Sequence, residues 1–94
     1  MNSISELIVL CEKFKKNAFG IKEFQSKLGE ILLPDMCKYT LEKVQHNAHN
    51  SLEEIIYCYN KETGKLYADK VAEELIQAAK AEQKRLENYK PYQE

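Results

Sequence analysis

The chain has 94 residues, of which 44% are hydrophobic and 31% are charged, and its formal net charge is −1. This size and balance fit one globular domain over residues 1–94 and exclude an intrinsically disordered chain. Without a basic excess, binding to nucleic acid through its phosphates is not expected, and no apolar run approaches the roughly 18–20 residues that insert across a membrane.

The composition favours helices over strands. Only three Gly and two Pro occur, too few for the turns of a many-stranded sheet, whereas Lys, Glu, Leu, Ala and Gln are frequent and favour helices. The chain starts without the basic residues that open a signal peptide, and its three cysteines form no C-x-x-C pair. We therefore expect an all-helical cytoplasmic protein with reduced thiols.

The first predicted helix covers about residues 4–18. Ser3-Ile4-Ser5-Glu6 matches a capping box, in which the Ser3 hydroxyl accepts a bond from a first-turn amide and Glu6 reaches back. Gly20 suits the left-handed conformation that closes a helix, so the helix is expected to end just before it. The apolar residues at helical spacing are Leu7, Leu10, Cys11, Phe14 and Ala18.

The second predicted helix covers about residues 21–33. Pro34 ends it, because the residue before a proline is pushed out of the helical region. Gly29 lies inside this helix at a cost of about 1 kcal/mol against Ala, which indicates close approach of a neighbouring helix. The apolar stripe consists of Ile21, Phe24, Leu28, Ile31 and Leu32.

The third predicted helix covers about residues 35–60, with Asp35 as its cap. Its polar stretch at residues 46–51 is typical of a loop, so a break near residues 47–50 is the alternative to one continuous helix. The apolar positions nevertheless keep one helical phase, which a loop would disturb, and we favour the continuous helix. Those positions are Cys37, Leu41, Val44, Ala48, Leu52, Ile55 and Tyr59.

A turn is predicted at residues 60–65, with Gly64 as its pivot, followed by a last helix over about residues 65–89. The apolar stripe of that helix thins after Ala79, so its last turns are expected to project, and Pro91 ends it. Amphipathic helices with short connections bury their stripes most simply as an antiparallel bundle. The predicted fold is therefore an all-α antiparallel bundle of three to four helices.

No motif for catalysis or for a cofactor is found, and we expect the protein not to be an enzyme. The chain has no G-x-S-x-G elbow, no phosphate-binding loop and no H-E-x-x-H. Glu42, His46, His49 and Glu53 would form one polar stripe on a continuous third helix, which could hold a metal or act as a pH sensor. Because no second histidine-bearing helix exists, we interpret the stripe as a solvated face.

The second half of the chain carries most of the acidic residues. Residues 51–94 hold nine acidic and seven basic side chains, against six and seven in residues 1–50. Carboxylates beside an outward tyrosine are typical of a protein-binding surface, because tyrosine supplies rigid contact area and clustered charge steers a basic partner. A solubilising surface is the alternative interpretation. The predicted partner-binding residues are Glu53, Glu54, Tyr57, Glu62, Asp69 and Glu73.

The layout of the chain resembles small helical immunity proteins of bacteria. The resemblance lies in Phe14…Gly20-Ile21-Lys22-Glu23-Phe24, in Leu52-Glu53-Glu54-Ile55-Ile56-Tyr57, and in the polar turn and closing helix that follow. It is similar to the colicin D immunity type, including relatives that protect against contact-dependent growth-inhibition toxins, and equally to four-helix immunity proteins against membrane-active bacteriocins. The colicin D type implies a cytoplasmic protein that binds a cognate toxin, often a nuclease, and covers its basic active site with the six residues named above.

Two other functions remain open. One is a small DNA-binding or adaptor protein that uses a basic side of the first two helices. The other is a structural module that dimerises through the exposed part of its last helix. The basic side consists of Lys13, Lys15, Lys16, Lys22 and Lys27.

Overall fold

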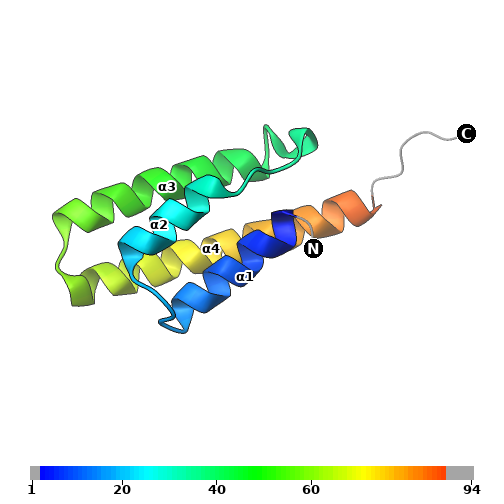
Figure 1. The fold of residues 1–94 in the computed structure, drawn as a ribbon. Helices are drawn as coiled ribbons and strands as arrows, with labels where there is room; N and C mark the ends of the chain where they lie inside the picture. The colour runs from blue at the N-terminus through cyan, green and yellow to red at the C-terminus, as the bar shows by residue number, and fades with distance from the viewer. Residues whose placement is uncertain (1–2, 89–94) are drawn as a thin grey trace, which may run out of the picture.

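The computed structural model describes residues 3–88 and contains four α-helices and one 3-10 turn (Figure 1). No strand occurs among these residues, so the predicted all-α bundle is confirmed, with four helices. The elements are α1 (Ser3–Lys15), α2 (Ile21–Glu30), η1 (Asp35–Cys37), α3 (Leu41–Cys58) and α4 (Lys61–Asn88).

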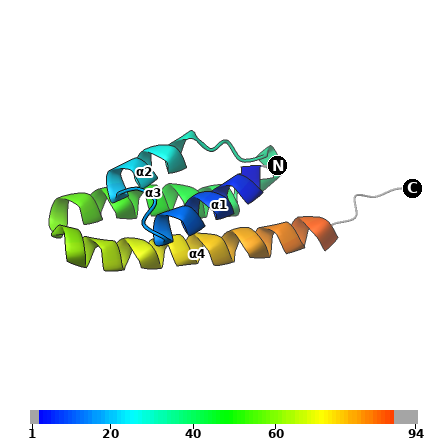
Figure 2. The same cartoon turned by 60° about the horizontal axis from the view of Figure 1, so that its bottom comes forward.

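The four helices form a ring in which each one packs against its two neighbours, in the order α1, α2, α3, α4 (Figures 1 and 2). Consecutive helices run antiparallel, and α4, the longest, lies against both α1 and α3. The predicted end of the last helix at residue 89 and the proline beyond it, Pro91, lie outside the described residues. The ring buries most of the predicted apolar stripes in one core, but Leu32, which follows the end of α2, is 83% exposed, and Ala18, Tyr59 and Tyr67 are exposed as well, so these four were wrongly assigned to the buried stripes.

Two stacked phenylalanines lie in this core. The rings of Phe14 and Phe24 are fully buried, and their centroids are 4.3 Å apart. Each large apolar side chain removed from water contributes about 1.5–3 kcal/mol, so the stripes supply the main stabilising term. The largest fully buried side chains are Phe14, Phe24, Leu7, Leu28, Leu41, Leu52, Leu75, Cys11 and Cys37.

The first helix ends differently from the prediction. It stops at Lys15, and Asn17 takes the left-handed conformation, with a φ of 66°. The amides of residues 17 and 18 bond back to carbonyls in the last turn of α1, which is a Schellman closure with asparagine in place of glycine. The prediction that Gly20 closes α1 was therefore wrong: Gly20 has an extended backbone and lies at the N-cap of α2.

The second helix also ends early, at Glu30 rather than near residue 33. The buried side chain of Gln45 donates from its Nε2 to the carbonyl oxygens of Leu28 and Ile31, both at 2.9 Å. At the end of a helix the last carbonyls lack the amides of a following turn, and Gln45 supplies a donor to these two carbonyls instead. The chain then runs on to Pro34, whose backbone is extended.

The third helix is continuous from Leu41 to Cys58, which confirms the favoured prediction over a break near residues 47–50. Its predicted start at residue 35 was wrong. Residues 35–37 form the separate turn η1, in which the amide of Cys37 bonds the carbonyl of Pro34 at 2.9 Å. This turn places the side chain of Cys37 in the core. Cys37 is therefore buried, as its helical spacing from the apolar residues of α3 predicted, although it is not part of α3.

The link between α3 and α4 is shorter than predicted, and the turn expected at residues 60–65 is absent. Asn60 starts α4, because its Oδ1 accepts a bond from the amide of Thr63 at 2.8 Å, as an N-cap residue does. Gly64 is buried inside the first turn of α4, where an added Cβ would lie 3.3 Å from Cγ2 of Ile55. Gly64 therefore allows close packing rather than a turn.

The end of α4 extends beyond the other helices, as expected (Figures 1 and 2), but its turns around Glu82 and Arg85 are held by the α2–α3 connection. Glu82 leaves only 5% of its surface exposed and accepts hydrogen bonds from Thr40 at 2.7 Å and from Nε and Nη2 of Arg85 at 3.0 and 2.8 Å. Arg85 also donates to the carbonyl of Met36 at 3.3 Å. The bond from Arg85 is the main reason why the pKa of Glu82 is lowered to about 2.

Candidate functional site

Three of the six predicted partner-binding residues lie on the outer face of α3. Tyr57 leaves 78% of its surface exposed there, and Glu53 and Glu54 are exposed beside it. Neither glutamate forms an ion pair with a basic side chain of residues 3–88. We call these three residues the Tyr57 face.

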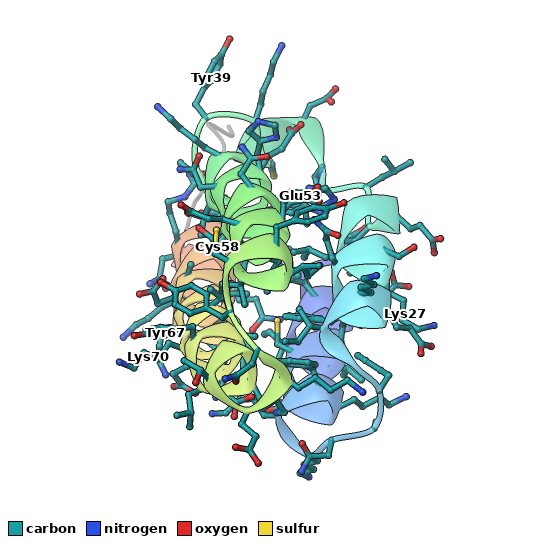
Figure 3. The ribbon with its side chains drawn as sticks, turned by 90° about the vertical axis from the view of Figure 1, so that its left-hand side faces the viewer. Lys27, Tyr39, Glu53, Cys58, Tyr67 and Lys70 are labelled. Carbon is teal, nitrogen blue, oxygen red and sulfur yellow. The ribbon has the colours of Figure 1, made fainter. Side chains whose placement is uncertain are left out.

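The two glutamates of the Tyr57 face point toward different neighbouring helices. Glu53 lies on the side of α2 (Figure 3), where its carboxylate accepts a bond from Nε2 of Gln25 at 2.7 Å. Glu54 borders a shallow hollow between α3 and α4 together with Tyr67 and Lys70. With 3.6 residues per turn, Tyr57 projects between these two directions. The result is a tyrosine with one carboxylate on each side.

Asp69 and Glu73 lie in the seam between α4 and α1 and are already paired there. Nζ of Lys65 lies 2.6 Å from Oδ1 of Asp69, and Glu73 forms an ion pair with Lys15 of α1. Hydrogen bonding to Lys15 is the largest of the effects that lower the pKa of Glu73 below its ordinary value. In the ring of helices this seam is opposite the seam between α2 and α3, so these two residues do not extend the Tyr57 face.

Glu62 occupies a third position, exposed in the first turn of α4. A negative charge there complements the positive end of the helix dipole, which is an ordinary stabilising role. The structure thus brings Glu53, Glu54 and Tyr57 together and places Glu62, Asp69 and Glu73 on other parts of the surface.

The histidines of α3 have different surroundings. His46 is exposed, whereas His49 packs over Gly29, where an added Cβ would lie 3.6 Å from Cδ2 and Nε2 of the ring. This is an ordinary van der Waals distance to a side chain of α3, so the contact does not by itself require a glycine at position 29. Residues 3–88 contain no group of three or more His, Cys, Asp and Glu side chains that could hold a metal.

The cysteines provide no activated thiol in the core. Burial raises the pKa of Cys11 to about 12 and that of Cys37 to about 11, so both thiols are protonated at neutral pH. A nucleophile needs the thiolate, and these two thiols do not form it under ordinary conditions. Cys58 is exposed at the end of α3.

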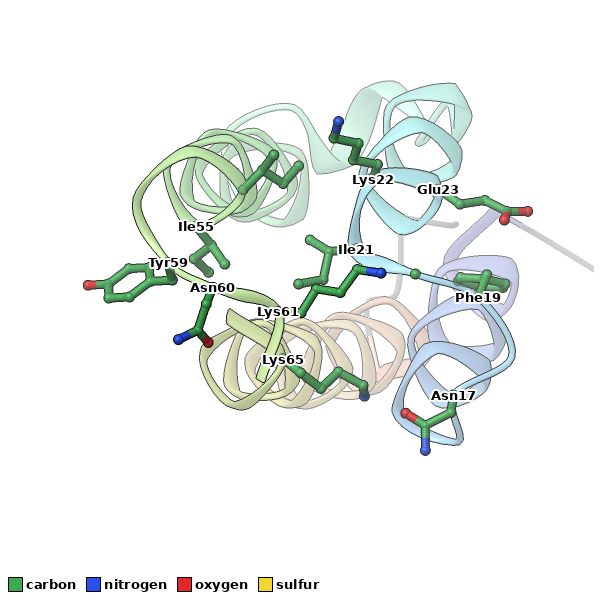
Figure 4. Close-up of a pocket in the computed structure, with 12 residues that line it drawn as sticks. Asn17, Phe19, Ile21, Lys22, Glu23, Ile55, Tyr59, Asn60, Lys61 and Lys65 are labelled. Carbon is green, nitrogen blue, oxygen red and sulfur yellow. The ribbon is translucent and has the colours of Figure 1, made fainter. Parts of the chain in front are cut away.

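A pocket that the sequence analysis did not foresee opens at the end of the bundle where the α1–α2 loop meets the α3–α4 link (Figure 4). Its volume is about 790 Å³, and its 12 lining residues come from two segments, 17–23 and 55–65. Ile21, Ile55 and Ile56 give it an apolar floor. We call it the end pocket. No helical stripe marks it, because its two halves lie far apart in the sequence.

The rim of the end pocket is basic. Lys22, Lys61 and Lys65 line it, and only Lys65 is paired: its Nζ binds Asp69 and lies 3.3 Å from the carbonyl oxygen of Phe14. Glu23 also lines the pocket, but its carboxylate points away from the opening (Figure 4). Lys22 and Lys61 form no ion pair with any carboxylate of residues 3–88.

The basic side predicted on the first two helices is partly neutralised. Lys15 pairs with Glu73, and Lys27 lies 3.7 Å from Glu23 in an i, i+4 pair. Lys13, Lys16 and Lys22 remain outside such pairs within the described chain. Few phosphate contacts would therefore be available on this side, and each contributes only modestly to affinity.

Within residues 3–88, no helix combines the length and the apolar content needed to cross a membrane. Comparisons with protein-family models, with curated proteins and with solved structures find no match for this chain. The relation to immunity proteins therefore stays a prediction from the layout of the sequence.

Proposed function

We propose that this protein binds and neutralises a partner protein through the Tyr57 face, in the manner of a toxin-immunity protein that acts in the cytoplasm. The observation that supports this most is the exposure of Tyr57, 78%, on a continuous helix. Tyrosine is enriched at the centres of protein interfaces, where its ring leaves water and its hydroxyl finds a partner. Here it stands between two carboxylates.

The charge of the Tyr57 face fits a basic partner. Glu53 and Glu54 lie on either side of Tyr57 and have no basic partner among the described residues. Lysine or arginine side chains around a toxin's cleft would pair with them, which raises the association rate and fixes the orientation of the complex. Neutralisation then requires only that α3 covers the cleft.

The rigidity of α3 supports the same mechanism. Leu52 and Ile55, on its inner side, are buried in the core, and Gln45 ties it to the end of α2. A surface held in this way loses little conformational entropy on binding, which favours affinity. Asp69 and Glu73, in contrast, must break existing ion pairs before they contact a partner, and we expect them to contribute little.

The experiment is a growth-protection assay. Immobilised wild-type protein captures its partner from source cells, and the captured protein is then expressed alone and together with this chain. We expect the captured partner to stop growth when it is expressed alone and to become harmless when the wild-type chain is present.

Two matched triple variants test whether the partner binds at the Tyr57 face. Glu53→Ala, Glu54→Ala and Tyr57→Ala together should weaken binding by about a hundredfold or more and abolish protection. Glu30→Ala, Tyr39→Ala and Glu87→Ala remove the same residue types at exposed positions elsewhere, including a tyrosine that is 82% exposed, and should leave protection intact. Full protection by the first variant, folded as judged by circular dichroism, would refute the placement, and a harmless captured partner would refute the function.

A further inference from the structure

The end pocket combines an apolar floor with two amines that have no acidic partner in the described chain. Ile21 and Ile55 point into the opening, and Lys61 extends across it, whereas Lys22 lies on the far side with its amine turned away from the opening (Figure 4). Gly64, beneath the floor, has no side chain; its missing Cβ would lie 3.5 Å from Cδ1 of Ile21 and 3.8 Å from Cβ of Tyr59. The side chains of the floor can therefore converge on the backbone of α4.

The backbone at the start of α2 adds to the positive character of the pocket. The first bond within α2 joins the amide of Phe24 to the carbonyl of Gly20 at 3.0 Å, so the amides of residues 21–23 have no acceptor within the helix. Gly20 supplies no side-chain cap, and an added Cβ there would meet no atom within 4 Å. An acidic group in the opening beside Ile21 would thus approach the amine of Lys61, which extends across it (Figure 4), and these amides.

We propose that the end pocket binds a small amphipathic carboxylate, a molecule with an apolar chain or ring and one acidic head group. The apolar body would cover Ile21, Ile55 and Ile56, and the carboxylate would lie beside Lys61, with the exposed side chain of Lys22 turning in toward it. A neutral apolar molecule would leave both amines without a counterion, and a bare anion would leave the floor exposed to water. The volume of about 790 Å³ is in the range of small-molecule sites, roughly 300–1,000 Å³. The inference is independent of the Tyr57 face.

Three probes test this ligand class on the full chain by isothermal titration and by amide chemical shifts. Decanoate has the chain and the charge, decanol has the chain alone, and inorganic phosphate has the charge alone. Decanoate should bind about tenfold or more tightly than either other probe, and its largest shifts should fall on residues 20–22 and 55–61. Equal affinities for decanoate and decanol, equal affinities for decanoate and phosphate, or shifts centred elsewhere would overturn the proposal.

A pair of isosteric variants isolates the charge. Gly20→Asp and Gly20→Asn put side chains of the same shape into the open space beside the pocket, at a position where either can cap α2. Both should stay folded, and Gly20→Asp should bind decanoate about tenfold more weakly than Gly20→Asn because only the aspartate repels the head group. Equal decanoate affinities of the two variants would contradict the assigned position of the carboxylate.

Discussion

At one end of the bundle the buried side chains of Gln45 and Glu82 are hydrogen-bonded to the α2–α3 connection, and at the other end two lysines that line a pocket have no acidic partner in the described chain. We define the connector end as residues 31–40 with Gln45, Glu82 and Arg85, and the pocket end as the residues that line the end pocket. No buried side-chain polar atom of residues 3–88 lacks a hydrogen-bond partner. The groups of the connector end are therefore expected to stabilise the fold, and the lysines of the pocket end are available for a ligand.

The largest expected effect is at Glu82. Its replacement by Ala leaves Thr40 and Arg85 without their shared acceptor, and we expect the free energy of unfolding to fall by about 2–3 kcal/mol. Urea denaturation followed by circular dichroism measures this. Glu87→Ala, at an exposed position of the same helix, should change it by less than about 0.5 kcal/mol. Equal losses for both variants would mean that the connector end is not held by Glu82.

The same carboxylate should give the fold a defined acid sensitivity. The pKa of Glu82 is lowered from an ordinary value of 4.5 to about 2, so the folded state holds its proton less tightly than the unfolded state does. Its stabilising effect is complete above about pH 5.5 and is lost as the pH falls toward 2, with a total of about 3 kcal/mol. Comparing unfolding of wild type and Glu82→Gln across this window should show a flatter pH dependence for the variant; parallel curves would contradict the prediction.

Gln45 should contribute somewhat less than Glu82 to the free energy of unfolding. Gln45→Ala removes the side-chain donor of both carbonyls and leaves that of Leu28 with only the amide of Ile31 at 3.3 Å, so we expect a loss of about 1–2 kcal/mol together with faster hydrogen exchange in the last turn of α2. Asn47→Ala, an exposed change in the same helix, serves as the control and should stay within about 0.5 kcal/mol. Unchanged exchange at the end of α2 would show that Gln45 does not hold it.

The smallest effect concerns the pocket end. Gly20 has the extended backbone of an N-cap residue, with φ −83° and ψ 179°, so Gly20→Asn should raise the free energy of unfolding by a few tenths of a kcal/mol through a new cap. Thermal unfolding detects such a gain as a small rise in Tm. A loss of about 1 kcal/mol or more would indicate that Gly20 needs the left-handed conformation after all.

The helical stripes made the fold predictable, because apolar periodicity depends on nearby residues alone. The roles of Gly20 and Gly64 were not predictable in the same way. A glycine in a sequence is compatible with a helix end, a turn or a close contact, and only the tertiary neighbours decide between them. For Gly64 that neighbour is Ile55, and for the closure of α1 the deciding residue is Asn17.

The candidate sites follow the same division. Glu53 and Tyr57 could be placed on one face from their spacing along a single helix. The pairing of Glu73 with Lys15 could not be predicted, because the two residues lie on different helices and are 58 positions apart in the sequence. The sequence alone did not single out Glu82, because its acceptor role depends on Thr40, which lies in the connection between α2 and α3. The end pocket likewise exists only once two distant segments meet.

The contrast between the two ends is tested most directly by a double variant, Lys22→Met with Lys61→Met, measured for both urea unfolding and decanoate binding. Because neither lysine has an acidic partner in the described chain, we expect an unfolding free energy within about 0.5 kcal/mol of wild type and a loss of decanoate affinity of about tenfold or more. Lys43→Met with Lys84→Met, two exposed lysines away from the pocket, should change neither quantity. A clearly destabilised Lys22/Lys61 variant, or one that binds decanoate as wild type does, would contradict the account.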